Sequence, residues 1–235
     1  MMDTTTLILF VAAFVPAAFY MLYIIAFDDD KPEPPLALLM GALVGIGAAF
    51  AVKYGWPSVG TQVGTTPSWQ EGITSGFLDV AVPAELVKWI ALFIFLSLNR
   101  FYDEYIDGIV YSVCLAMGFA GLWSVWFLTD VMGTNALTLL EMVLFLIFIL
   151  VPIQLAAGTM MGYFFALARE KHRLRNFLLS LLLPILIDGV LCSMVLIIGN
   201  HWEYYFIAGI LFSILAMIFY TQAFRLLEMD SNANS

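Results

Sequence analysis

The chain has 235 residues, of which 63% are hydrophobic and 11% are charged, and its mean hydropathy is +0.96. Soluble domains carry roughly 25% charged residues, so this composition predicts a protein that crosses a membrane several times. The formal net charge of −9 argues against nucleic acid as a partner, because nucleic-acid binding needs clustered basic residues.

Seven stretches are apolar and long enough to cross a bilayer as helices, which predicts an all-α transmembrane helix bundle. In chain order they cover residues 5–27, 36–54, 77–98, 106–129, 137–167, 176–198 and 204–224. The fifth is overlong, and Pro152 predicts a kink or a break there, with a short re-entrant or interfacial segment before it as the alternative. Residues 1–228 then form a single transmembrane domain, and residues 229–235 form a polar tail.

The basic residues predict the orientation of the bundle. Seven of the nine fall on one side of a seven-span arrangement: Lys31, Arg100, Arg169, Lys171, Arg173, Arg175 and Arg225. Because basic loops stay in the cytoplasm, we expect the N-terminus outside and the C-terminus in the cytoplasm.

Polar side chains interrupt three of the predicted spans. Glu85 and Lys88 lie in the third span, Gln154 follows Pro152 in the fifth, and Asp188 lies in the sixth. A charge in a span costs about 2.5–3.5 kcal/mol on insertion scales, so such residues usually have partners or a function. We expect these four to meet in one polar pocket at membrane depth, because each needs a partner where water is scarce.

Simpler interpretations of the same residues stay open. Glu85 and Lys88 are three residues apart on one helix face, so they can form an ion pair that only fixes packing. Gln154 can form a hydrogen bond between helices, and Asp188 can be a neutral carboxyl group that is buried or bonded to a neighbouring helix. Asp107, at the start of the fourth span, is a further candidate for the pocket, although carboxylates there are also typical of a helix N-terminus.

Known catalytic and metal-binding motifs are missing from the sequence. No histidine or cysteine cluster has zinc spacing, and neither GxSxG nor HExxH occurs. We therefore expect no metal and no other cofactor.

Four blocks of sequence resemble the PrsW family of intramembrane proteases, which belongs with the type II CAAX prenyl proteases and the γ-secretase scaffold subunit. They are DDDKPEPPLALLMG at 28–41, AELVKW at 84–89, FYDEYIDGIVYSVCLAMGFA at 101–120, and VPIQLAAGTMMGYFFALA at 151–168 with LLPILIDG at 182–189. The resemblance implies an integral protein of a bacterial or archaeal inner membrane, with transmembrane proteins as substrates or partners.

The chain departs from the family where the chemistry is expected. Of two adjacent glutamates in the family motif only Glu85 remains, because Ala84 replaces the first. Trp123 and Ser124 stand in place of a Glu-Asn pair. Gln154 and Asp188 stand at the histidine positions, although the family's proposed mechanism needs a glutamate to activate water and histidines to bind metal or stabilise an oxyanion.

Three functions follow from these observations. The first is a PrsW-like fold that has lost proteolysis in part or fully and binds other membrane proteins. The second is an active intramembrane protease in which Glu85 and Asp188 form the acid–base pair and Lys88 tunes Glu85. The third is a small transporter or ion pathway, which suits buried charges but lacks inverted repeats. Whether the chain is an enzyme, and whether it forms oligomers, stays open.

Overall fold

The computed structural model describes residues 4–26, 33–56, 68–134, 139–171 and 173–198, together with the single positions 210, 214, 218, 221 and 225. All elements in these ranges are helices, in accordance with the predicted all-α class. They are α1 (Thr4–Ile25), α2 (Pro35–Gly55), α3 (Trp69–Thr74), the π-helix η1 (Ser75–Ala81), α4 (Val82–Leu98), α5 (Tyr105–Thr134), α6 (Leu139–Phe145), the π-helix η2 (Leu146–Leu150), α7 (Val151–Lys171) and α8 (Leu174–Ile198).

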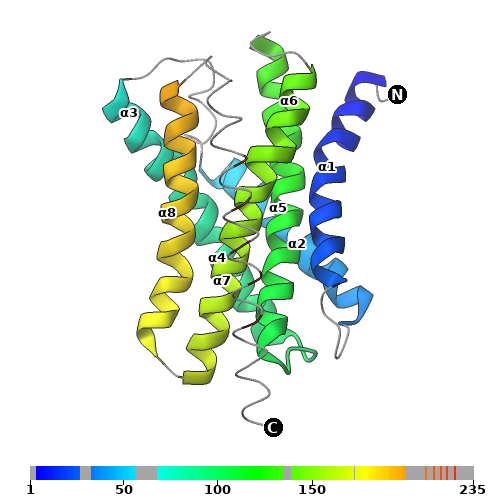
Figure 1. Cartoon of the computed structure of the whole chain (residues 1–235), viewed down its shortest axis with the longest axis vertical. Coiled ribbons are helices and arrows are strands. Elements are labelled where there is room, and N and C mark those ends of the chain that lie inside the picture. The colour runs from blue at the N-terminus through cyan, green and yellow to red at the C-terminus, as the bar shows by residue number, and fades with distance from the viewer. Residues whose placement is uncertain are drawn as a thin grey trace.

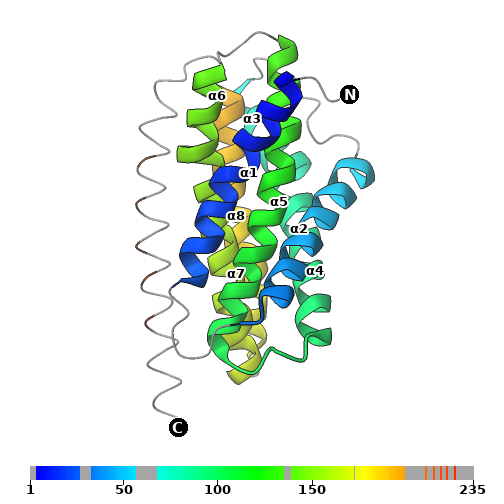
Figure 2. The ribbon, with the colours of Figure 1, turned by 90° about the vertical axis from the view of Figure 1, so that its right-hand side faces the viewer.

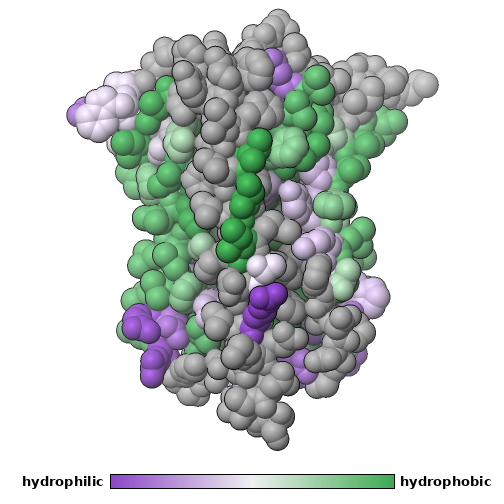
Figure 3. Space-filling model, in the orientation of Figure 1, coloured by the Kyte–Doolittle hydropathy of each residue, from purple (hydrophilic) through white to green (hydrophobic). Residues whose placement is uncertain are grey.

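Five helical stretches are long and apolar enough to cross a membrane: Pro35–Gly55, Trp69–Leu98, Tyr105–Thr129, Val143–Arg169 and Leu174–Ile197. A shorter apolar helix, Phe10–Tyr23, lies within α1, where the first span was predicted. The predicted seventh span, 204–224, falls almost entirely outside the described residues. On the face seen in Figure 3, hydrophobic residues flank the middle of the molecule and strongly hydrophilic ones lie near its lower end.

Helix α5 is the centre of the bundle. Of its most apolar stretch, 94% is buried, and it packs most extensively against α2 and α7, with α1 beside them (Figures 1 and 2). Helix α8 packs against α7 and against the continuous helix formed by α3, η1 and α4. This arrangement places α4, α7 and α8 next to one another, which brings three polar segments of the sequence together.

The third spanning helix begins earlier than the sequence predicted. It starts at Trp69 and not at Phe77, so it takes in part of the predicted loop. The cause is a capping box: Glu71 N–H donates to the Ser68 hydroxyl, and the Ser68 N–H donates to the Glu71 carboxylate at 2.9 Å.

Two π-helical turns each lie just before a proline inside a helix. Segment η1 ends at Ala81, two residues before Pro83, and η2 ends at Leu150, two residues before Pro152. Proline lacks an N–H and clashes with the preceding turn, and a wider π turn accommodates this defect without ending the helix. The predicted break or re-entrant segment at Pro152 is therefore wrong, because the helix continues through it.

Glycines allow α5 to approach its neighbours closely. A Cβ on Gly45 of α2 would lie 2.8 Å from the carbonyl carbon of Leu115 and 2.9 Å from the amide nitrogen of Phe119, both in α5. Across α5, the Ser112 hydroxyl donates to the Gly158 carbonyl of α7 at 2.7 Å. Small residues at these crossings let backbones touch, as expected between helices in a membrane.

We predict that Gly45→Ala lowers the melting temperature of the detergent-purified protein, because the added methyl group forces the α2 and α5 backbones apart at a cost of about 1–3 kcal/mol. Gly47 is the matched control, since a Cβ there meets nothing within 4 Å. Gly47→Ala should leave thermal unfolding unchanged or slightly raise its midpoint. Equal effects of the two substitutions would contradict the close contact.

Candidate functional site

Four polar side chains meet where α4, α7 and α8 pack together, as expected from the sequence. The Lys88 ammonium donates to Glu85 Oε1 at 2.6 Å, one turn away on α4. It also donates to the side-chain oxygen Oε1 of Gln154 in α7. The Gln154 Nε2 in turn donates to Asp188 Oδ1 of α8 at 3.2 Å. We call Glu85, Lys88, Gln154 and Asp188 the buried quartet.

The buried quartet is closed to solvent. Glu85 and Lys88 are 0% and 1% exposed, and the other two members are also buried. The Phe119 ring of α5 lies 4.7 Å from the Lys88 ammonium, which adds a cation–π contact to the same charge. Lys88 is thus the positive partner of the Glu85 carboxylate in an environment where unpaired charge is costly.

One oxygen of the quartet has no hydrogen-bond partner among the described residues. Glu85 Oε2 is buried without such a partner, and the Asp188 carboxyl lies close enough to act on Glu85 electrostatically. Asp188 also accepts a weak hydrogen bond from the Cys192 thiol at 3.8 Å. Glu85 Oε2 is thus a buried acceptor beside the Asp188 carboxyl.

Three members of the buried quartet lie shortly after a proline in their helices. Glu85 comes two residues after Pro83, Gln154 two residues after Pro152, and Asp188 four residues after Pro184. Glu85 and Gln154 each lie four residues after the end of a π turn, η1 and η2 respectively. Because π turns change the direction in which the following side chains point, they offer a physical reason why polar groups on separate helices converge.

A small cavity of about 130 Å³ adjoins the quartet. Gln154 and Asp188 line it together with Ala84 and Trp123, two of the positions at which the sequence departs from the PrsW pattern. Trp123 stacks on Phe119, with ring centroids 5.4 Å apart. Ser124, a third such position, is fully buried next to Trp123 but does not line the cavity.

Asp107 does not join the quartet, which corrects the sequence-based interpretation that placed it in the pocket. Its Oδ2 accepts the backbone N–H groups of Asp103 and Glu104 at 3.0 and 2.8 Å, so it caps the N-terminus of α5. The alternative interpretation, a carboxylate cluster at the helix start, is confirmed. One oxygen each of Asp103, Asp107 and Glu33 lies within 4.8 Å of the others.

Glu33 is a buried acid that the sequence analysis did not single out. Its carboxyl accepts a hydrogen bond from the Tyr111 hydroxyl of α5, which ties the chain before α2 to the central helix. Burial raises the pKa of Glu33 above its ordinary value, and the charges of Asp103 and Glu104 act in the same direction. The acidic run before the second predicted span was visible in the sequence, but nothing in it pointed to Tyr111 as the partner.

Comparison with known proteins identifies a matching family and several related proteins. Residues 33–221 match the family described as "PrsW family intramembrane metalloprotease". The chain is 26% identical over 207 residues to "Protease PrsW" of Bacillus subtilis, covering 86% of this chain and 88% of that one. It is 27% identical over 199 residues to "Protease PrsW" of Geobacillus kaustophilus, covering 83% and 82%. No solved structure matches.

We predict that Lys88→Met strongly destabilises the protein, by about 3–5 kcal/mol, because it leaves the buried Glu85 carboxylate without its counter-charge. The double variant Lys88→Met/Glu85→Gln removes both charges of the ion pair and should recover much of the loss. Thermal unfolding in detergent measures both effects. A double variant that unfolds at a lower temperature than Lys88→Met would contradict the pairing.

The raised pKa of Glu33 predicts a pH dependence of stability. The folded protein holds the proton of the Glu33 carboxyl more tightly than the unfolded chain does. In the unfolded chain the carboxyl has its ordinary pKa of 4.5. The stabilisation is therefore complete below that value and is lost as the pH rises through the raised pKa. Glu33→Gln cannot ionise, so the melting temperature of the variant minus that of the wild type should grow between about pH 4 and pH 8. A difference that stays constant or shrinks would contradict the burial of Glu33.

Proposed function

Because the chain belongs to the PrsW family of intramembrane metalloproteases, we propose that it binds transmembrane segments of other membrane proteins at the family's site while its own proteolytic step is impaired or lost. The observation that carries this proposal is the cavity beside the buried quartet. Four positions that differ from the family's catalytic pattern, Ala84, Trp123, Gln154 and Asp188, line this one cavity. Their departures thus gather at a single place.

The chemistry of these side chains supports impairment. Hydrolysis needs a base that can take a proton from water within hydrogen-bond reach. Neither alanine nor an amide can take that proton under ordinary conditions. The remaining carboxylate of the motif, Glu85, is bound by the Lys88 ammonium at 2.6 Å, so one of its two oxygens already has a cation as its partner.

The buried quartet does not fit the metal ion that the family description implies. The Lys88 ammonium already lies between Glu85 and Gln154, and a divalent cation at the same oxygens would meet a like charge. The remaining donors are carboxylates and an amide, whereas hydrolytic zinc sites use histidine with at most a few carboxylates. The two histidines of the chain, at positions 172 and 201, lie outside the described residues. We therefore derive no catalytic step through a metal.

The cavity suits an apolar side chain of a transmembrane helix. Besides the quartet members, its walls are mostly aliphatic and aromatic, with Phe127, Phe145 and Leu191 among them. Members of a membrane protease family act on membrane proteins, so a bound transmembrane segment is the occupant that the family relationship favours. In the proposed function, the chain binds such a segment although its cleavage step is impaired or lost.

An active protease is the second candidate, and one observation favours it. Glu85 Oε2 is buried without a hydrogen-bond partner among the described residues and lies near the Asp188 carboxyl. Two interacting carboxyl groups with separated pKa values are able to divide the roles of acid and base. In this alternative, either Glu85→Gln or Asp188→Asn abolishes cleavage.

We predict that cells producing the wild-type protein show the same protein N-termini within membrane spans as cells producing Glu85→Gln/Asp188→Asn. Mass spectrometry of N-termini in isolated membranes makes the comparison without a known substrate. Protease PrsW of Bacillus subtilis, produced in the same host, is the positive control. Ala84→Glu should also yield no new termini, because one restored carboxylate leaves the other positions changed. Termini that need wild-type Glu85 and Asp188 would overturn the proposal.

The binding half of the proposal has its own test. A photo-crosslinking amino acid at Leu150, which lines the cavity, should capture intact transmembrane segments of other proteins. The same group at Leu178 of α8, which is 49% exposed and does not line the cavity, is the matched control. Cross-links of equal yield at both positions, or cross-links only to lipid, would contradict a binding site.

A further inference from the structure

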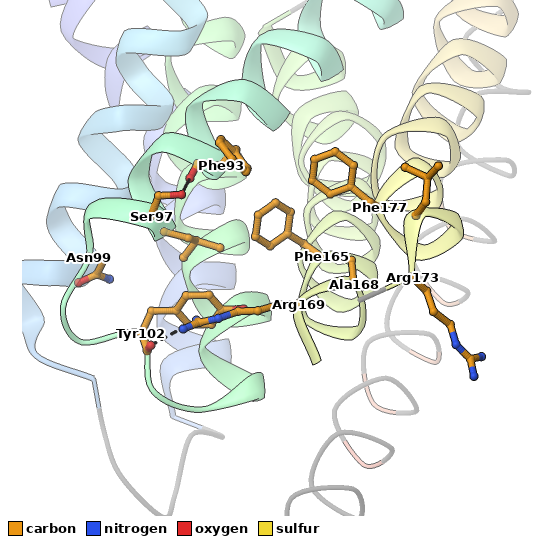
Figure 4. Close-up of a pocket in the computed structure, with 11 residues that line it drawn as sticks. Phe93, Ser97, Asn99, Tyr102, Phe165, Ala168, Arg169, Arg173 and Phe177 are labelled. Carbon is orange, nitrogen blue, oxygen red and sulfur yellow. Dashed lines mark hydrogen bonds between the residues drawn. The ribbon is translucent and has the colours of Figure 1, made fainter. Parts of the chain in front are cut away.

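A second pocket, separate from the buried quartet, lies between the C-terminal ends of α4 and α7 and the first turns of α8. It has a volume of about 720 Å³. This end of the bundle carries the basic residues that predict the cytoplasmic side, and in that orientation the pocket lies where the bilayer core meets the cytoplasmic headgroups. Figure 4 shows the side chains that line it.

The part of the pocket nearest the membrane core is aromatic. Phe93 of α4, Phe165 of α7 and Phe177 of α8 enclose it, with centroids 6.1 Å apart for Phe93–Phe165 and Phe165–Phe177 and 6.3 Å for Phe93–Phe177. Phe93 is 45% exposed and Leu174, which also lines the pocket, is 71% exposed. Such surfaces are stable beside hydrocarbon but costly beside water, so this part of the pocket favours an apolar chain.

The other end of the pocket is basic. Arg169 stacks on the Tyr102 ring at 4.1 Å and donates to the Tyr102 carbonyl at 3.4 Å, as Figure 4 shows. Arg173 is exposed at the edge and points away from the phenylalanines. No carboxylate is among the lining residues that the structure describes. The Tyr102 contact holds one guanidinium in place, and its remaining N–H groups suit a phosphate.

We propose that this pocket binds an anionic glycerophospholipid, with its phosphate held by Arg169 and Arg173 and an acyl chain lying along Phe93, Phe165 and Phe177. Basic pockets between helices at the cytoplasmic surface bind anionic headgroups, and arginine recognises phosphate through paired hydrogen bonds. A lipid matches both ends of this pocket with one molecule. An acidic protein segment matches only the basic end, because its charges gain nothing from the three rings.

The lipid would act on the packing of α4 against α8, near the buried quartet. Phe177 contacts Trp89, with ring centroids 4.6 Å apart, and the Trp89 Nε1 donates to the Ser180 hydroxyl at 2.8 Å. Trp89 follows Lys88 directly in α4. A ligand that bridges α4, α7 and α8 below this contact binds the folded bundle better than the unfolded chain and therefore stabilises it.

The full-length protein, purified in a mild neutral detergent, tests this inference by thermal unfolding and native mass spectrometry. Phosphatidylglycerol should raise the melting temperature and remain bound, whereas phosphatidylcholine and glycerol 3-phosphate should do neither. Arg169→Gln/Arg173→Gln should weaken the apparent phosphatidylglycerol affinity at least about tenfold. Arg173→Gln alone should weaken the apparent phosphatidylglycerol affinity by a smaller factor. Because Arg173 is exposed, this single variant serves as a check should the double variant misfold.

Arg175 supplies the matched control, because it is exposed in the same region but does not line the pocket. Arg175→Gln should bind phosphatidylglycerol as the wild type does. Equal responses to phosphatidylcholine, or equal losses in Arg175→Gln and Arg173→Gln, would overturn the site. If an acidic peptide binds with an affinity that depends on Arg173 and phosphatidylglycerol does not bind, the ligand is a protein segment and the lipid proposal is overturned.

Discussion

The buried ammonium of Lys88 is the constraint on which the centre of this structure depends. It has no water to solvate it, so the helices around it must supply oxygen atoms, and they do so from Glu85 on its own helix and Gln154 on α7. The Gln154 side-chain amide in turn donates a hydrogen bond to Asp188 of α8. This network thus links α4 to α7 and α8, which lie more than 50 residues later in the chain. Because breaking a buried pair leaves an uncompensated charge, the network specifies this packing even if its net contribution to stability is modest.

The same network explains how a protease site is turned to binding in the proposed function. The π turns η1 and η2 precede Pro83 and Pro152, and Glu85 and Gln154 follow these prolines. The Lys88 ammonium donates to both the Glu85 carboxylate and the Gln154 amide oxygen, and Trp123 and Ala84 give the adjoining cavity an apolar wall. In the proposed function, this one set of contacts both holds the helices together and occupies an oxygen of Glu85.

Much of this could be predicted from the sequence, for identifiable reasons. The membrane class and five spans follow from hydropathy alone, and the convergence of Glu85, Lys88, Gln154 and Asp188 follows from the cost of isolated polar groups in spans. The helical start at Ser68 was missed, although Ser68 and Glu71 have capping-box spacing. The continuity at Pro152 and the Glu33–Tyr111 contact were not predictable, because each depends on a local π turn or on the packing of α5.

The central claim is that Lys88 holds Glu85 and Gln154 together inside the bundle. Solid-state NMR on the labelled protein in lipid bilayers tests it most directly, through dipolar couplings between the Lys88 side-chain nitrogen and the side-chain carbonyl carbons of its partners. The account predicts a charged ammonium with strong couplings to both Glu85 and Gln154. A neutral amine, or an ammonium coupled to neither carbon, would contradict it.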